Sequence, residues 1–442
     1  MEMLEETQRM LEKHPLCNYC LGRQLALLGY GLDDNRRGEA IKTLLTMKAH
    51  KLSVIGEKAG ISLLKTLATN GRFLMAAQVL KKLGKKAGKT RQCYLCEGIF
   101  EQLPRLACAS IEKLADYEYT TFLVGIKLPA MVEEREDEFK AEFDVKHGEG
   151  MRNGLSRELG KAISEMTQKT AEYKTPDVVV IITPFSEEVA IQSNPLYIAG
   201  RYKKLARGIP QSRWHCPKCR GEGCDECNWT GKLHPESVEE IISEPVLEKT
   251  RGEETAFHAA GREDVDVRML GRGRPFIVEV KKPKTRFIDL KSLAKAINKQ
   301  AKAKVKVANL RFVDKGMVRR LKKGEGVPKV YTALVEFESD VSDEALETLE
   351  QTLSNTMIRQ QTPLRVLPRR ADRLREKYIY ETKAKRVTPN CIEVRIRCQG
   401  GLYIKELITG DEGRTDPNIT GLVGAKAKPV SLDVLDIIPR GE

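Results

Sequence analysis

Long apolar runs are missing from this sequence, and their absence excludes several classes of protein. No stretch approaches the roughly 20 apolar residues that a membrane-spanning helix needs. The most apolar stretch, residues 178–182, has only the length of a strand. Residues 1–13 are acidic and have no apolar core, so they do not resemble a signal peptide. We therefore expect a soluble, cytoplasmic protein with no membrane partner.

Patterns that bind nucleotides or organic cofactors are also missing. Residues 84–90 read GKKAGKT, which is one residue short of the phosphate-binding P-loop spacing. Gly148 and Gly150 form a GxG without the third glycine of a dinucleotide fingerprint. The six histidines are scattered and form no ligand pair. We expect any chemistry of this chain to proceed without such a cofactor.

Positive charge is abundant and unevenly distributed. The 442 residues include 76 Lys and Arg against 62 Asp and Glu, a net charge of +14, and residues 281–330 alone account for that excess. Such a block predicts a surface for a polyanion, although a lysine-rich solvated helix is the alternative. Leu290, Leu293, Ala294 and Ile297 recur at helical spacing, which favours an ordered amphipathic helix and a fixed patch.

Cysteines are the next abundant feature, and eight of the eleven form CxxC pairs: Cys17 and Cys20, Cys93 and Cys96, Cys216 and Cys219, Cys224 and Cys227. Two such pairs can close a tetrahedral structural zinc site. Residues 216–227, CPKCRGEGCDEC, match a compact zinc knuckle. The first two pairs are 72 residues apart. They either meet in one site, which we favour, or remain separate redox or packing pairs. We expect one or two structural Zn²⁺ sites.

The order of the predicted elements indicates an α+β protein. Residues 35–90 have helical periodicity, and residues 200–215 contain glycine, proline and basic residues typical of a hinge. We expect strands at 121–128, 178–183, 265–270, 275–280, 329–338 and 392–398, and helices at 155–170, 289–303, 342–357 and 401–409. Alternation in the last strand places Arg395 and Arg397 on an outer face that suits nucleic acid.

Residues 260–276, AGREDVDVRMLGRGRPF, form an acidic element within the basic half. Asp264 follows Gly-Arg-Glu at the entrance to an apolar strand, where the adjacent arginines keep a carboxylate ionised. A salt-bridged hairpin is the alternative interpretation. Asp266 is the rival of Asp264 as a candidate nucleophile, but it lies two residues deeper on the strand.

Three motifs in order resemble those of pseudouridine synthases. The run GRED ending at Asp264 resembles the GRxD signature, KVYTA contains Tyr331, and GLYIKEL, with Tyr403 and Lys405, is similar to the GTYIRSL motif of the TruB branch. The stretches GRYKKLARGIPQSRW, TPLRVLPRR and GLYIKELITGDEGRTDPN extend this resemblance to the archaeal and eukaryotic Pus-ten type of tRNA pseudouridine synthase.

The resemblance implies a pseudouridine-synthase-type mixed or antiparallel sheet in residues 201–442, with the zinc knuckle inserted at 214–230. It also implies a zinc-stapled accessory RNA-binding region in residues 1–200, with a THUMP-like module at about 75–190. The implied reaction converts uridine to pseudouridine in the TΨC arm of tRNA, at position 55 and also 54, in a monomer that needs no cofactor for catalysis.

The resemblance further implies residue roles. Asp264 is the expected nucleophile or base, and Tyr331 stacks on the flipped base in a pocket that Tyr403 lines. Lys405 pairs with Asp264, and Arg262 holds a phosphate or the flipped nucleotide. Basic residues of the 281–330 block, with Arg365, Arg369 and Arg370, contact phosphate.

The alternative function is a noncatalytic zinc-containing RNA-binding or ribosome-associated protein. It accounts for the CxxC pairs and the basic block, but it leaves the three ordered motifs unexplained. The role of the knuckle at 216–227 stays open.

Overall fold

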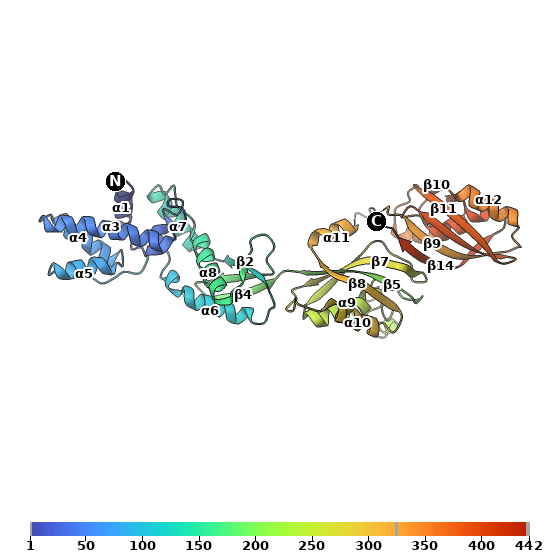
Figure 1. The fold of residues 1–442 in the computed structure, drawn as a ribbon, viewed down its shortest axis with the longest axis horizontal. Helices are drawn as coiled ribbons and strands as arrows, with labels where there is room; N and C mark the ends of the chain where they lie inside the picture. Colours follow the sequence, from blue (N-terminus) through green and yellow to red (C-terminus); the bar gives the residue numbers. More distant parts are fainter. Residues whose placement is uncertain (1, 323–325, 439–442) are drawn as a thin grey trace. The chain divides into compact units, whose positions relative to one another are not determined.

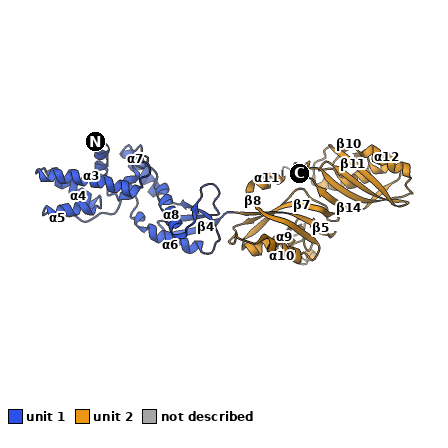
Figure 2. Ribbon diagram, in the orientation of Figure 1, with its two compact units in different colours: residues 1–194 blue, residues 195–442 orange. Residues whose placement is uncertain are grey.

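The computed structural model describes residues 2–322 and 326–438. The chain divides between Asn194 and Pro195 into two compact units, coloured blue and orange in Figure 2. The expected hinge at 200–215 is wrong in its first part, because residues 200–204 belong to strand β5 (Leu196–Lys204) of the large sheet. Gly200 serves close packing there, since a Cβ atom would lie 2.6 Å from the Leu310 side chain.

Unit 1 begins with a helical part, as its apolar periodicity predicts. Its helices are α1 (Glu2–Lys13), α2 (Asn18–Arg23), α3 (Asp34–Val54), α4 (Lys58–Thr69) and α5 (Leu74–Lys82). Asp33 caps α3 by accepting a hydrogen bond from the Arg36 amide. Leu45, Leu64 and Leu80 are fully buried where α3, α4 and α5 pack together. The helical prediction for 35–90 is confirmed up to Lys82, and the lysine-rich segment after it has no helix.

The remainder of unit 1 is a helix-and-sheet module. Its elements are η1 (Ile99–Gln102), α6 (Leu103–Leu114), β1 (Thr121–Ile126), α7 (Ala130–Glu142), α8 (Met151–Thr167), β2 (Thr170–Ala171), β3 (Val178–Thr183) and β4 (Glu188–Ser193). The strand order is β2-β1-β3-β4, with β1 parallel to β3. The strands expected at 121–128 and 178–183 are present, and the helix expected at 155–170 begins earlier, at Met151.

Unit 2 is built on a ten-stranded sheet of order β13-β10-β11-β12-β9-β14-β7-β5-β8, with β6 also paired to β7 (Figure 1). The other strands are β6 (Glu254–Ala259), β7 (Arg268–Lys281), β8 (Val305–Val313), β9 (Lys329–Phe337), β10 (Thr356–Gln360), β11 (Arg375–Thr388), β12 (Cys391–Cys398), β13 (Thr415–Asp416) and β14 (Ala427–Ile437). β14 runs parallel to β7 and antiparallel to β9, so the sheet is mixed, as expected.

Strand β7 replaces two strands expected at 265–270 and 275–280. Gly271 and Gly273, which suggested a break, have positive φ angles of 52° and 79° but remain inside the strand. A Cβ on Gly271 would lie 1.7 Å from the Leu435 carbonyl oxygen, so this glycine permits close approach of β14.

Helices of unit 2 pack on both faces of the sheet. They are α9 (Val238–Thr250), α10 (Leu290–Gln300), α11 (Lys315–Lys322), α12 (Asp343–Leu353), α13 (Ile404–Thr409) and α14 (Ile419–Val423), with the short turns η2 (Asp225–Cys227) and η3 (Leu364–Arg369). α9, α10, α12, α13 and α14 share one core with the inward side chains of the sheet. α11 instead packs through Val318 against Tyr197 and Ile277, which point to the opposite face. No helix in the described ranges is long and apolar enough to cross a membrane.

Candidate active site and candidate metal centres

Asp264 lies in the loop that joins β6 to β7, and residues 260–267 are here called the Asp264 loop. The sequence predicted a strand from residue 265, with Asp264 at its entrance and Asp266 within it, but β7 begins only at Arg268. Gly261 opens the loop with a φ of +81°, a left-handed conformation that favours glycine. A Cβ at that position would lie 3.1 Å from Arg274 Nη1 and 3.2 Å from Lys329 Nζ. The Gly-Arg-Glu-Asp motif thus needs its glycine for both conformation and space.

The Asp264 loop is anchored by Glu263, whose side chain is fully buried. Its carboxylate lies 2.8 Å from Arg274 Nε and accepts hydrogen bonds from the hydroxyl of Tyr202 and from Gln211 Nε2. Gln211 Nε2 also donates to the carbonyl of Gly261 at 3.0 Å. Burial, followed by the Glu263 charge, raises the pKa of Tyr202 well above its usual value, so Tyr202 remains a neutral donor.

A buried lysine fixes the backbone at Asp264 itself. Lys204 Nζ donates to the carbonyl oxygens of Ile209, Asp264 and Val265 at 2.7, 2.9 and 3.0 Å. Burial lowers the pKa of Lys204 to about 8. Together, Glu263 and Lys204 fix the backbone before and after the Asp264 side chain.

The Asp264 carboxylate is 43% exposed and meets two cations. Its Oδ2 lies 3.2 Å from Nη1 of Arg365 and 3.4 Å from Nζ of Lys405. Arg365 is positioned in turn by Glu406, whose Oε1 accepts from Arg365 Nε at 2.6 Å. These contacts place two positive charges beside an accessible anion, which suits a nucleophile or base.

Lys405 contacts Asp264 as the sequence predicted, but its shorter contacts are to Asp266. The distances from Nζ to the two Asp266 oxygens are 2.9 and 2.8 Å. Burial is the largest single effect and raises the Asp266 pKa, but the hydrogen bond and the charge of Lys405, together with smaller contributions, lower it below its usual value. Lys405 therefore bridges the two aspartates, and Asp266 is the one it holds more tightly.

Two tyrosines named from the motifs lie around this centre. Tyr403 accepts a hydrogen bond from Arg370 at 3.1 Å, and the Arg365 guanidinium is 5.9 Å from its ring centroid. Tyr331 on β9 pairs with Ile396 of β12 and is partly buried. Burial raises the Tyr331 pKa strongly, and Asp264 is among the charges that add to this effect. The two side chains are thus within electrostatic range of each other.

Arg262 and the basic strand face lie elsewhere. Arg262 Nη2 donates a hydrogen bond to Ser212 Oγ at 2.6 Å, and Ser212 precedes the zinc knuckle in the chain. The two cations that contact Asp264 are instead Arg365 and Lys405. Because Tyr331 pairs with Ile396, the alternating Arg395 and Arg397 face the opposite side of the sheet. On that face Arg395 and Arg397 line a pocket together with Arg272 and Glu381, and the expectation that this face suits nucleic acid stays a prediction.

The basic block at 281–330 is divided rather than gathered in one wall. Its predicted amphipathic helix is present as α10, with Leu293 and Ile297 buried. α10 belongs to the main core of unit 2, which also contains Val267 of the Asp264 loop. α11 packs on the opposite face of the sheet. Residues 323–325 and the Arg369 side chain lie outside the described residues. Phosphate contact by the block therefore remains a prediction.

Sequence reasoning assigned Arg365 only to phosphate and did not identify Glu263, Lys204 or Glu406. Arg365 had a usable signal, since TPLRVLPRR is one of the stretches that carry the family resemblance. Lys204, Glu263 and Glu406 also lie in stretches that carry the resemblance, but the burial of an isolated Lys or Glu cannot be read from a sequence.

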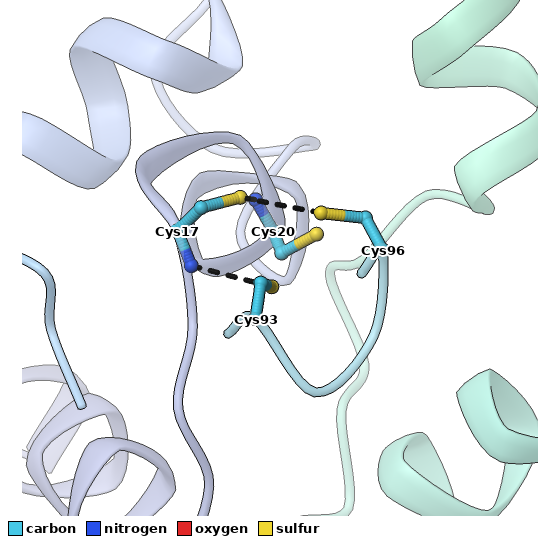
Figure 3. A group of neighbouring side chains, drawn as sticks. All are labelled: Cys17, Cys20, Cys93 and Cys96. Carbon is cyan, nitrogen blue, oxygen red and sulfur yellow. Dashed lines mark hydrogen bonds between the residues drawn. The ribbon is translucent and has the colours of Figure 1, made fainter. Parts of the chain in front are cut away.

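The first two CxxC pairs meet in unit 1 (Figure 3). Cys17 and Cys20 flank the start of α2, and Cys93 and Cys96 lie on a turn before η1. The four Sγ atoms lie within 4.8 Å of one another, and those of Cys17 and Cys96 are 3.7 Å apart. A tetrahedral ion with Zn–S distances of about 2.3 Å requires sulfurs about 3.8 Å apart. The residues therefore fit one tetrathiolate site.

The knuckle in unit 2 fits a second such site. Its four Sγ atoms also lie within 4.8 Å of one another, with separations of 3.8 Å between Cys216 and Cys224 and between Cys219 and Cys227. The Gly223 and Gly231 amides donate to Cys219 and Cys227 sulfur, each at 3.2 Å, which stabilises thiolate ligands. Four cysteines per site leave no open position for substrate, so both sites suit a structural role.

Models of known protein families match two segments of this chain. The family model described as "Pus10, C-terminal" matches residues 197–438, and "Pus10 THUMP domain, archaeal" matches residues 106–183. The chain is 40% identical over 438 residues to "tRNA pseudouridine synthase Pus10" of Methanothrix thermoacetophila, covering 99% of this chain and 94% of the relative. It is 43% identical over 437 residues to the protein of that name from Methanocaldococcus jannaschii, covering 97% and 93%.

Solved structures give a weaker likeness. A Cbf5-Nop10-Gar1 complex is similar at 18% identity and a TM-score of 0.28, over 45% of this chain and 44% of that chain.

Proposed function

Because the chain belongs to the Pus10 family, whose curated relatives are named tRNA pseudouridine synthases, we propose that it isomerises uridine in the TΨC arm of tRNA. Position 55 is the expected target, with position 54 as a second one. The observation that carries this proposal is the Asp264 carboxylate, which is accessible and flanked by Arg365 and Lys405 on a firmly anchored loop.

The reaction breaks the bond between N1 of uracil and C1′ of ribose, turns the base, and forms a bond from C5 to C1′. The C5 proton is lost and N1 regains one, so atoms balance without a redox group or an activated donor. Asp264 supplies the anion that such a step needs, either as nucleophile toward C1′ or as base toward the ribose. Catalysis accordingly calls for no cofactor.

The surrounding residues complete the proposed pocket. Tyr331 stacks on the flipped uracil, and its raised pKa keeps it neutral beside the anion. Tyr403 lines the same pocket with its hydroxyl fixed by Arg370. Lys405 and Arg365 hold Asp264 in place, and Arg262, exposed at the loop entrance, holds a phosphate or the flipped nucleotide.

Both tetrathiolate sites are proposed to hold structural Zn²⁺. The site of unit 1 connects the start of α2, through Cys17 and Cys20, to the turn before η1, through Cys93 and Cys96. The site of unit 2 stabilises the fold of the knuckle. Bound metal supplies a fixed tetrahedral crosslink in each place and takes no part in the isomerisation.

A monomer acting on tRNA in the cytoplasm is the setting we propose. The noncatalytic RNA-binding alternative is disfavoured, because the family match covers the segment that contains Asp264, Tyr331 and Lys405.

The direct test is incubation with unmodified tRNA transcripts, followed by carbodiimide mapping of pseudouridine at nucleotide resolution. Pseudouridine at position 55, or at both 54 and 55, is the expected result. Binding of tRNA without any isomerised uridine would favour the noncatalytic alternative.

A further inference from the structure

The zinc knuckle, residues 214–233, is connected to the Asp264 loop through Gln211 and Ser212, which precede it in the chain. Gln211 Nε2 donates to the Gly261 carbonyl at 3.0 Å, and Ser212 Oγ accepts from Arg262 at 2.6 Å. The segment that leads into the knuckle is therefore bonded to the loop that carries the proposed reacting carboxylate.

The neck of the knuckle is a rigid two-stranded base. The Cys216 amide donates to the Gly231 carbonyl at 2.9 Å, and the Leu233 amide donates to the Trp214 carbonyl at 2.9 Å. Glu240 of α9 pairs with both sides of this base, 3.0 Å from Arg213 and 2.5 Å from Lys232. The knuckle is thus fixed to the body of unit 2.

Its tip presents an indole ring to solvent. Trp229 is 72% exposed and has a left-handed φ of 59°. Gly223 lies against it, since a Cβ there would be 3.4 Å from the indole Cε3 atom and 3.1 Å from the Trp229 carbonyl oxygen. A large aromatic side chain supported from one side and open on the other has the form of a stacking platform.

The charge of the knuckle selects the kind of partner. Lys218, Arg220 and Lys232 are balanced by Glu222, Asp225 and Glu226, so these side chains contribute no net charge. Four thiolates around one Zn²⁺ leave two excess negative charges, so the metal-loaded knuckle has no surplus of positive charge. Two of the cations are also engaged internally, Lys218 with Glu226 and Lys232 with Glu240. A surface without excess positive charge is poorly suited to the phosphate backbone, whereas an exposed indole suits the flat face of a base.

We propose that Trp229 stacks on an unpaired base of the tRNA while the target uridine occupies the site at Asp264. This inference rests on the proposed function and assigns the knuckle a substrate-docking role. The metal keeps the Trp229 turn rigid, which lowers the entropic cost of stacking.

The first experiment uses the fact that the chain has only two tryptophans, Trp214 and Trp229. Trp214 packs against His234 in the neck, with ring centroids 5.3 Å apart, and Trp214→Phe keeps an aromatic ring there. In this full-length, metal-loaded variant, Trp229 is the sole source of indole emission. We expect unmodified tRNA transcript to quench it, with a midpoint equal to the dissociation constant from filter binding. Emission that tRNA leaves unchanged would overturn the inference.

The second experiment compares tRNA affinities of variants of the same knuckle. Trp229→Ala should weaken binding between about 5-fold and 150-fold, the range of one base–aromatic stack. Trp229→Phe should recover most of the affinity. Leu233→Ala is the matched control, because Leu233 is 54% exposed on the same knuckle but has no ring. Wild-type affinity in Trp229→Ala, or an equal loss in Leu233→Ala with metal content intact, would contradict stacking.

The two proposals fail in different ways. A wild-type chain that isomerises no tRNA uridine overturns the proposed function. Normal isomerisation together with an unaffected Trp229→Ala variant overturns only the role of the knuckle.

Discussion

At the scale of single residues, the Asp264 carboxylate is exposed and has two cationic neighbours. Its proposed role needs the exposure as well as the neighbouring cations. Asp264→Asn keeps the size and removes the charge. We expect uridine isomerisation to fall by at least about 10⁴-fold, as when other enzymatic nucleophiles are removed. Affinity for tRNA should change little, because one carboxylate contributes nothing to phosphate contact. Pseudouridine mapping and filter binding measure the two quantities, and retained turnover would disprove the assignment.

Asp266→Asn is the control for that experiment, since it lies two residues away and shares Lys405 with Asp264. It should reduce turnover far less than Asp264→Asn. A complete loss confined to the Asp266 variant would exchange the two roles.

Arg365 connects Asp264 to the buried Glu406 and is the second residue to test. Arg365→Met should slow turnover by about 10²-fold, as when one charged partner of a reacting group is removed. It should also destabilise the fold by about 1–2 kcal/mol, less than a fully buried pair, because the Arg365 side chain is 41% exposed. Turnover assays and urea unfolding measure these effects.

The double variant Arg365→Met with Glu406→Gln separates the two effects. It removes the uncompensated Glu406 charge, so stability should return while turnover stays low. Recovery of both would mean that Arg365 matters only for folding.

Sequence motifs named the residues that are proposed to react, but not the buried residues that support them. Asp264, Tyr331, Tyr403 and Lys405 could be named because each sits in a short motif with a chemical reason. The preference of Lys405 for Asp266 over Asp264 could not, because a difference of 0.6 Å between two contacts depends on the turn at 265–266.

At the scale of elements, β5 contacts the Asp264 loop through Lys204, which donates hydrogen bonds to the carbonyls of Asp264 and Val265. The Lys204 pKa is depressed in the folded protein, to about 8, from about 10.4 when unfolded. Between these values the unfolded chain binds more protons, so the Lys204 contribution to stability should rise as pH increases from about 8 to 10.4.

Lys204→Met lacks this titration. The free energy of unfolding of the native chain should therefore rise relative to that variant from pH 8 to pH 10, by up to about 2–3 kcal/mol for a shift of this size. Urea unfolding at several pH values measures the difference. A gap that stays constant or shrinks over this range would show that Lys204 is not held as the structure has it.

Elements were predictable where periodicity was regular and not where glycine had a packing role. β3 coincides with an unbroken run of β-branched residues, β9 lies within the strand predicted at 329–338, and α10 follows its apolar spacing. The glycines at 200, 271 and 273 resemble breaks in a sequence, but they allow neighbouring chains to approach inside continuous strands. The helix expected at 342–357 ends at Leu353, because Asn355 adopts a φ of 55° and β10 begins directly after it.

At the scale of the whole molecule, the two tetrathiolate sites lie in different units and should be separable. The native chain should bind two Zn²⁺ per molecule. Cys93→Ser with Cys96→Ser should leave one ion and destabilise unit 1, since structural zinc contributes about 10–16 kcal/mol in small domains. Elemental analysis and thermal unfolding are the measurements.

Cys216→Ser with Cys219→Ser is the matched variant in unit 2. It should also leave one ion, while the thermal transition of unit 1 stays unchanged. Loss of both ions from either double variant would show that the sites are not independent.

The basic block offers a second test at this scale, because α10 and α11 carry similar charge on opposite faces of the sheet. Neutralising Lys291, Lys295 and Lys299 on α10 should lower the slope of log affinity against log salt by up to about 2.7, at about 0.9 per phosphate contact. Neutralising Lys315, Arg319 and Arg320 on α11 is the matched control and should lower it less. Equal slopes for the α10 set and the native chain would make α10 an ordinary solvated helix.

The tetrathiolate site of unit 1 also determines the order in which that unit can mature. Its ligands come from both ends of a segment that contains α3, α4 and α5, so the set is incomplete until Cys96 has left the ribosome. The three helices are synthesised before the crosslink can form, and Cys17 and Cys20 must wait for it as free thiols. Completion of the metal site therefore follows the synthesis of these three helices, and it closes a loop of chain that contains them.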